Sequence, residues 1–86
     1  MLNYEFICWL EGYLDLCPED IINKKKLRII RNHLNLVIAV EGSLGEINQV
    51  IMKEVSRLIE NNCSDVELNN FKSFARQQIM IVCNGT

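Results

Sequence analysis

At 86 residues, the chain is long enough for one small hydrophobic core and too short to divide that core between two domains. Hydrophobic residues make up 49% of it and there is a single proline, which excludes a disordered chain and a turn-rich β-barrel. The net charge of -2 does not favour nonspecific binding to duplex nucleic acid. Charged residues interrupt the apolar runs, so none approaches the roughly 20 residues that a membrane-spanning helix needs.

Apolar residues at helical spacing predict a first helix over residues 3–16. Its stripe contains Phe6, Trp9, Leu10, Tyr13 and Cys17, and it is widened by Ile7 and Leu14. Asn3 is the expected N-cap, because its side chain can accept a hydrogen bond from the first turn. Gly12 lies inside the helix, where glycine costs about 1 kcal/mol relative to alanine. Either another backbone passes close to Gly12, or the helix bends there, or the helix simply tolerates the glycine.

A second helix is predicted to begin near Pro18, or to restart near Lys24 after a break at residues 23–26. Its central part, residues 27–40, begins with one apolar face and becomes apolar on every side at residues 36–40. That last run also has the composition of a buried strand. We favour helix, because no partner strand is evident nearby.

Two further helices follow capping signals of the form S-x-x-E, at residues 43–46 and 64–67, and Gly42 is expected to end the second helix. The third helix is predicted to end at residues 61–62 and to bury Leu44, Ile47, Val50, Ile51, Val55, Leu58 and Ile59. The fourth has an inner face of Leu68, Phe71, Phe74, Ala75, Ile79 and Val82. It becomes apolar on all sides at residues 79–83, where strand is again the alternative.

Short connections between these helices favour antiparallel neighbours, so the expected fold is an all-α bundle of about four helices in a single domain, residues 1–86. The apolar runs at 36–40 and 79–83 exceed what four short helices can cover. We therefore expect a homo-oligomer that is built on these two runs.

The cysteines Cys8, Cys17, Cys63 and Cys83 lack the paired spacing of a zinc site, so no metal is assigned. The first residues do not resemble a secretory signal, which favours reduced thiols in the cytoplasm. No nucleophile motif, phosphate-binding loop or zinc-protease motif is present. We therefore expect neither enzymatic activity nor a cofactor, and a structural role for His33 outweighs a role as general base.

Basic side chains form three groups on the predicted helices: Lys24, Arg28 and Arg31; Lys53 and Arg57; Lys72 and Arg76. A guanidinium group can hold a phosphate through two hydrogen bonds, and oligomer symmetry would multiply such contacts. The candidate phosphate ligands are Arg28, Arg31 and Arg57, and the candidate contacts for a nucleotide base are Trp9, Tyr13 and His33. The simpler alternative is that the arginines are solvated and the aromatic rings belong to the core.

Two blocks, Phe6-Ile-Cys-Trp-Leu-Glu-Gly-Tyr-Leu-Asp15 and Ile30-Arg-Asn-His-Leu-Asn-Leu-Val37, resemble a group of small phage and prophage proteins. Those proteins carry F-x-Y-W-L-Q-G-F-F-E followed by I-x-x-H-L-x-L-V. The resemblance covers residues 6–37, with Cys8 in place of an aromatic residue and Glu11 in place of glutamine. Nothing after Val40 matches the pattern.

The resemblance implies an accessory phage protein that acts in the bacterial cytoplasm. Proteins of this kind often counter host antiviral defence, either by sequestering a nucleotide signal inside a symmetric oligomer or by blocking a host defence protein. The competing hypothesis is a structural or regulatory module that binds only protein, through its apolar ends, and has no small-molecule ligand.

Overall fold

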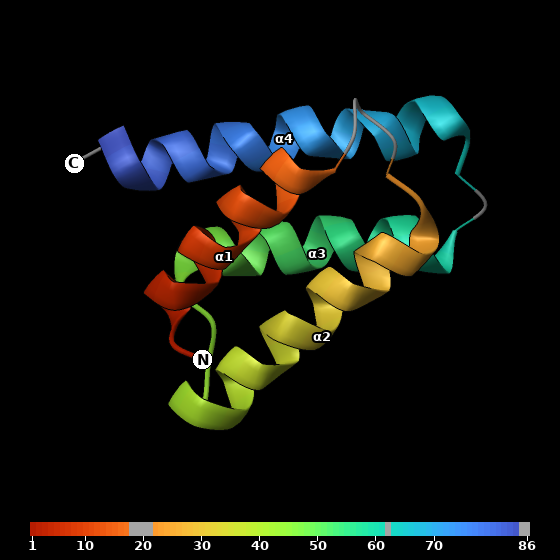
Figure 1. Ribbon diagram of the computed structural model, residues 1–86. Helices are drawn as coiled ribbons and strands as arrows, with labels where there is room; N and C mark the ends of the chain where they lie inside the picture. The colour runs from red at the N-terminus through yellow and green to blue at the C-terminus, as the bar shows by residue number, and fades with distance from the viewer. Residues whose placement is uncertain (18–21, 62, 85–86) are drawn as a thin grey trace.

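A computed structural model of the protein describes residues 1–17, 22–61 and 63–84. Across these ranges it contains four α-helices and no strand: α1 (Asn3–Leu16), α2 (Lys24–Glu41), α3 (Glu46–Glu60) and α4 (Asp65–Asn84). Each helix contacts the next along the chain, and α4 returns to contact α1. Neighbouring helices run antiparallel (Figure 1). The predicted all-α bundle is therefore confirmed.

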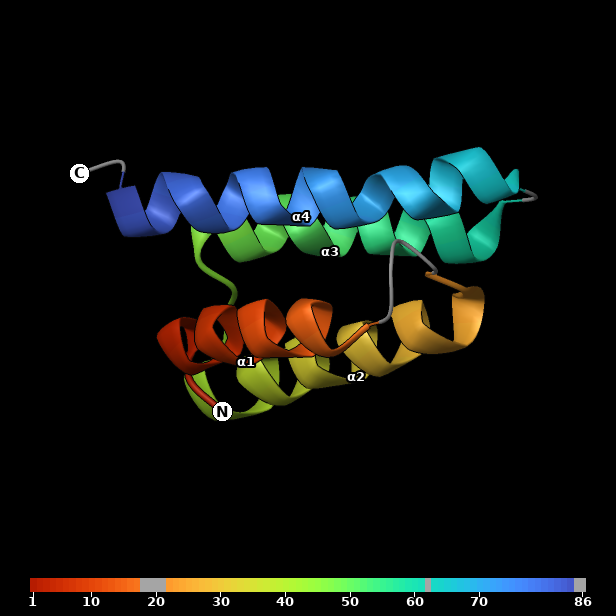
Figure 2. The ribbon, with the colours of Figure 1, turned by 45° about the horizontal axis from the view of Figure 1, so that its top comes forward.

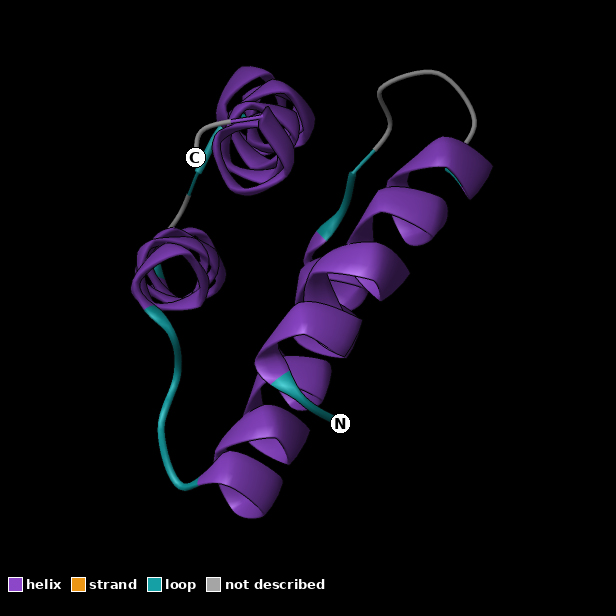
Figure 3. Ribbon diagram, turned by 90° about the vertical axis from the view of Figure 1, so that its left-hand side faces the viewer, coloured by secondary structure: helices purple, strands orange, loops and turns teal. Residues whose placement is uncertain are grey.

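The helices form two layers of two, α1 with α2 and α3 with α4 (Figure 2). A view along the axes of α3 and α4 shows the α1–α2 layer crossing them at an incline (Figure 3). The core between the layers takes side chains from all four helices, and its fully buried members include Phe6, Leu10, Leu14, Leu27, Ile30, Leu34, Ile51, Leu58 and Phe71. Burial of each such side chain stabilises the fold by roughly 1.5–3 kcal/mol.

The apolar stripes were predicted well, with differences at their edges. Ile7 and Leu14 are buried, whereas Trp9 and Tyr13 are half-buried and pack against the core from outside. Val50, expected on the inner face of α3, is 40% exposed. The spacing of apolar residues in the sequence therefore predicts the centre of each buried helix face more reliably than its edges.

The caps differ from two of the predictions. Residue 2, not Asn3, occupies the N-cap position of α1, and the Asn3 side chain turns to the α2–α3 connection instead. Ser43 does not cap α3, because residues 44–45 lie outside the helix and Gly45 takes the N-cap position. The backbone carbonyl of Ser43 accepts a hydrogen bond from Asn3 Nδ2 at 3.3 Å. Asn3 and Ser43 both have side chains that can cap a helix. In the structure, however, the Asn3 side chain binds the α2–α3 connection, which includes Ser43.

Other helix ends follow the predictions. Gly42 ends α2 in the left-handed conformation, with φ of 82°, which glycine adopts without strain. α2 begins at Lys24, the second of the two predicted starts, and Asn23, which was not predicted as its cap, accepts a hydrogen bond from the Lys26 N–H at 2.9 Å. Ser64 Oγ accepts from the Glu67 N–H at 3.3 Å, as in the predicted capping box. The alternative start of the second helix near Pro18 lies outside the described residues.

The two apolar runs are helical, so the strand alternative is wrong for both: residues 36–40 lie in α2 and residues 79–83 in α4. The start of α1, the end of α2, the start of α3 and the end of α4 all lie at one end of the bundle, on the left in Figure 1. We call this region the apolar end and define it by its exposed large apolar side chains, Leu2, Tyr4, Leu36, Val40, Met80 and Ile81.

Candidate functional site

Three of the candidate residues form an aromatic cluster where α1 meets α2. The Trp9 and His33 ring centroids lie 3.8 Å apart with the planes 13° from parallel. Trp9 also stacks on Tyr13, at 4.9 Å and 14°. The i, i+4 spacing places Trp9 and Tyr13 on one face of α1, and α2 supplies His33. The structure therefore brings together all three residues that were expected to contact a base, and they contact each other.

Hydrogen bonding fixes the orientation of His33 within this cluster. His33 Nδ1 lies 2.8 Å from the backbone carbonyl oxygen of Ile29, one turn earlier in α2. A carbonyl oxygen can only accept, so Nδ1 carries the hydrogen and donates it. Burial, and then the neighbouring Cys17, raise the pKa of the Tyr13 phenol above its ordinary value. The Tyr13 hydroxyl is consequently a neutral donor or acceptor over the physiological pH range.

The candidate arginines differ in their surroundings. Arg57 makes an ion pair with Glu54, with Arg57 Nε 2.6 Å from Glu54 Oε1, and this hydrogen bond raises the pKa of the Arg57 guanidinium. Arg31 faces Glu60 across the α2–α3 contact at 4.0 Å. Arg28 is exposed, and within the described residues its side chain has no hydrogen bond or ion pair. Two of the three guanidinium groups therefore already face a carboxylate.

The six candidate residues do not form a single pocket within one chain. His33 faces α1 and Arg31 faces α3, in agreement with helix geometry, since positions two residues apart lie about 160° apart around an α-helix. Arg57 lies instead in a hollow between α3 and α4 of about 230 Å³, together with Val50, Lys53 and Phe74. The aromatic cluster and Arg57 therefore lie on different faces of the bundle.

The outer face of α1 is open beside the aromatic cluster. A shallow hollow of about 490 Å³ is lined by Cys8, Trp9, Gly12, Tyr13, Asp15 and Leu16. A Cβ atom added at Gly12 would meet nothing within 4 Å, so no other backbone among the described residues passes close to this glycine. Leu16 is 83% exposed, and Asp15 accepts a hydrogen bond from Arg76 Nη2 at 2.6 Å. This face of α1 remains accessible in the single chain.

A network of hydrogen bonds around Asn3 and Asn48 was not predicted from the sequence. The Asn3 side chain links the start of α1 to the α2–α3 connection: Nδ2 donates to the Glu41 carboxylate, and Oδ1 accepts from the Gly45 N–H and from Asn48 Nδ2, each at 2.8 Å. Asn48 is 2% exposed and is the one buried polar residue of the described chain. The sequence feature that could have predicted this burial is the position of Asn48 among the apolar residues that α3 turns to the core, such as Ile51.

The cysteines and charged groups reveal no metal centre. The described residues contain no group of three or more His, Cys, Asp and Glu side chains that is placed to hold a metal ion. Cys8 is exposed, Cys17 is buried and Cys63 is half-buried, and none of these three is in a disulfide. Desolvation, followed by the hydrogen bond with Glu67, raises the pKa of the Cys63 thiol. None of the helices, over the described residues, is long and apolar enough to cross a membrane.

Comparison with protein families, curated proteins and solved structures finds no match to this chain. The functional argument therefore depends on the faces of the bundle: the apolar end, the aromatic cluster with its open face of α1, and the arginines on α2 and α3.

Proposed function

We propose that this protein acts by binding and not by catalysis, as a homo-oligomer whose copies meet at the apolar end. The observation that carries the proposal is the exposure of large apolar side chains there, with Val40 and Met80 each 60% exposed and Ile81 52% exposed. Exposed large apolar side chains that gather at one end of a protein favour an interaction surface there. Burial of each such side chain in a contact between copies would contribute up to about 1.5–3 kcal/mol.

The ligand that we propose for this assembly is a phosphate-containing nucleotide signal, bound at a seam between copies. Arg28 and Arg31 are neighbours on α2, whereas Arg57 lies on α3, where it is paired with Glu54. A second copy would therefore supply part of the phosphate contacts. Arg28 is exposed without a partner among the described residues, and the acids that face Arg31 and Arg57 are partly exposed. Exposed ion pairs contribute about 0–1 kcal/mol, so a phosphate could replace these carboxylates at small cost.

The aromatic cluster supports the same proposal, because its rings would contact the base of the nucleotide. The hollow beside Trp9 and Tyr13 has a volume of about 490 Å³, and a Cβ atom at the exposed Gly12 would meet nothing within 4 Å. Together with the resemblance to phage proteins, this favours a role in countering host antiviral defence by sequestering a nucleotide signal. Blocking of a host defence protein through the apolar end is the second candidate, since that surface needs no ligand.

Native mass spectrometry of the protein purified from a bacterial host tests these proposals directly. An oligomer with an added mass of a few hundred daltons per site, released on denaturation, supports nucleotide sequestration. An oligomer without added mass, which also fails to bind a panel of cyclic and linear nucleotides, leaves protein blocking as the better proposal. A monomer at all accessible concentrations contradicts the proposed use of the apolar end.

Variants separate the two surfaces. Val40→Asp or Ile81→Asp places a charge at the contact between copies and should yield monomers by size-exclusion chromatography with light scattering. Arg28→Ala and Arg31→Ala should keep the oligomer and lose the added mass. Circular dichroism of each variant confirms that the helices remain. If the aspartate variants assemble like the wild type, the copies do not meet at the apolar end.

A further inference from the structure

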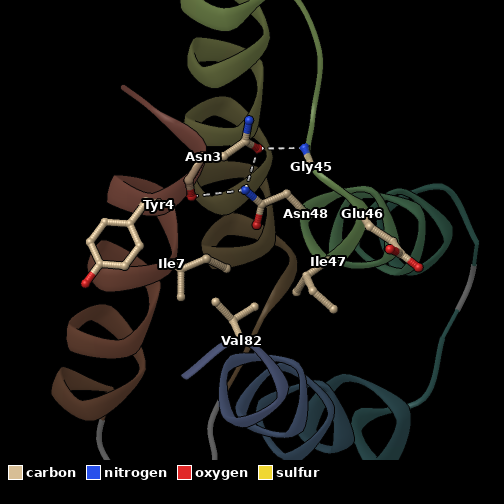
Figure 4. A pocket seen from close by; sticks show the side chains of 8 residues that line it. All are labelled: Asn3, Tyr4, Ile7, Gly45, Glu46, Ile47, Asn48 and Val82. Atoms are coloured by element: carbon tan, nitrogen blue, oxygen red, sulfur yellow. Dashed lines mark hydrogen bonds between the residues drawn. The ribbon is translucent and has the colours of Figure 1, made fainter. Parts of the chain in front are cut away.

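The buried Asn48 borders a hollow at one end of the bundle. This hollow of about 290 Å³ lies between the start of α1, the start of α3 and the end of α4, and its lining includes Ile7, Ile47 and Val82. Figure 4 shows the Asn48 side-chain oxygen turned toward these apolar side chains, away from the hydrogen bonds of its own nitrogen. The Asn48 oxygen therefore faces the apolar part of the hollow's wall, and polar side chains, including Glu46, complete the lining.

The hydrogen bonds fix which atom of the Asn48 amide faces the hollow. Its nitrogen donates to the Asn3 backbone carbonyl at 3.2 Å and to Asn3 Oδ1 at 2.8 Å. Asn3 cannot be turned over either, because Oδ1 accepts from the Gly45 N–H at 2.8 Å and Nδ2 donates to the Ser43 carbonyl at 3.3 Å. Exchanging nitrogen and oxygen in either amide would set donor against donor or acceptor against acceptor.

Asn48 Oδ1 is left as a buried acceptor, and no group of the described chain donates a hydrogen bond to it. Buried polar groups in native proteins are almost always paired, and leaving one unpaired is costly. A donor supplied by a bound molecule would remove that cost. The unpaired oxygen is thus an observation that points to a ligand, independently of the shape of the hollow.

We infer that this hollow binds a small neutral molecule with an apolar body and a single O–H or N–H donor, which it gives to Asn48 Oδ1. The volume of about 290 Å³ is near the lower limit of ligand pockets, which suits a molecule of one or two rings. Glu46 lines the hollow and Glu41 is bound to Asn3 at its edge, so an anion would be repelled. A cation would lose its hydration against the isoleucine and valine side chains.

The donor reaches Oδ1 only if a covering side chain moves, because this oxygen is shielded from solvent. Val82 is a half-buried member of the wall, as is Ile47, and it lies close to the end of α4. Val82 makes none of the hydrogen bonds between Asn3 and Asn48, so we expect a change of its rotamer to open the hollow and leave them in place. Binding is therefore expected to be reported first by the methyl groups of Val82 and by the Asn48 side-chain amide.

The test is an NMR titration of the full chain with two probes of the same shape, indole and indene. Indole carries one N–H donor and indene carries none. Indene is the more apolar of the two, so burial alone would make it bind more tightly. A hydrogen bond to Oδ1 reverses this order, and we expect indole to bind about tenfold more tightly, with shifts at Val82, Ile47 and the Asn48 side-chain amide.

Two variants on α4 complete the test. Val82→Phe fills the hollow and should weaken indole binding by at least about tenfold, since the ring occupies the space of the probe. Gln77→Phe, at an exposed position of the same helix that belongs neither to the hollow nor to the apolar end, is the matched control and should leave indole affinity within about twofold. Tyr4 lines the hollow and also belongs to the apolar end, so diffusion is measured in the same samples over a dilution series. This measurement follows the assembly of copies separately and distinguishes a loss of indole binding from a change in assembly.

Three outcomes would overturn the inference. These are indene binding as tightly as indole, indole shifts that map elsewhere than the hollow, and full indole affinity in Val82→Phe. Absence of indole binding at every dilution would show that the oxygen is satisfied in another way, by water or by a second copy, and would equally refute a small-molecule site.

Discussion

Removal of the Asn3 side chain is the sharpest test of how the start of α1 is held to the rest of the bundle. In Asn3→Ala, four hydrogen bonds are lost, those with the Glu41 carboxylate, the Ser43 carbonyl, the Gly45 N–H and Asn48 Nδ2. The backbone N–H of residue 3 can still donate to Glu41, and its carbonyl can still accept from Asn48. The variant therefore isolates the side chain.

The four bonds do not contribute equally. The bond to Asn48 is partly buried and should account for about 1–1.5 kcal/mol, because water cannot replace it well. The other three are exposed, and water replaces them, so together they contribute about 1 kcal/mol. The expected loss is about 2 kcal/mol in the free energy of unfolding. For a domain of this size, that corresponds to a fall in Tm of about 10 °C.

Urea denaturation followed by circular dichroism at 222 nm measures this loss, with thermal unfolding as a second readout. The matched control is Gln49→Ala, which removes one exposed hydrogen bond, to the Leu44 carbonyl at 2.8 Å, from the same region. Its expected effect lies within about 0.5 kcal/mol of zero. If Asn3→Ala costs no more than Gln49→Ala, the Asn3 hydrogen bonds do not stabilise the fold, and the fixed orientation of Asn48 loses its support.

Four further changes have expected outcomes. Gly12→Ala should raise the free energy of unfolding by about 0.5–1 kcal/mol, because the position is helical and a Cβ meets nothing there; a loss of assembly without a loss of stability would place a second copy at this face. Gly42→Ala should lower it by about 1 kcal/mol, measured in the same urea series, because φ is 82°. Leu34→Ala should cost about 2–5 kcal/mol, and a smaller loss would contradict its burial. Iodoacetamide followed by peptide mass spectrometry should modify exposed Cys8 before Cys63 at pH 8; the raised pKa of Cys63 means that less thiolate is present, so its rate should still increase above pH 9.0.

The helices could be predicted from the sequence because each carries a periodic apolar stripe that any bundle must bury. The runs at 36–40 and 79–83 were ambiguous in composition, and neighbouring helices resolved them as helix. The caps of α1 and α3 could not be predicted by local rules. Asn3 and Ser43 are residue types that often cap helices, yet neither is the N-cap of its helix. Asn3 instead binds the α2–α3 connection, forty residues away in the sequence.

The candidate site was predictable only within single helices. The stacking of Trp9 on Tyr13 follows from their i, i+4 spacing, and the Arg57–Glu54 pair follows from i, i+3 spacing. The addition of His33 to the aromatic cluster depends on how α2 is rotated against α1, which no local pattern specifies. The hollow beside Asn48 needs three helices and an amide network, so the sequence showed only a polar residue on an apolar face.

The arrangement of the helix ends has a practical consequence. Because α1 begins and α4 ends at the apolar end (Figure 1), a fusion at either end of the described chain starts from that end of the bundle. An affinity tag at either terminus would compete with a second copy for the same surface, and a tagged sample could be recovered as a monomer for that reason alone. The connection between α3 and α4, at the opposite end, is the better place for a label.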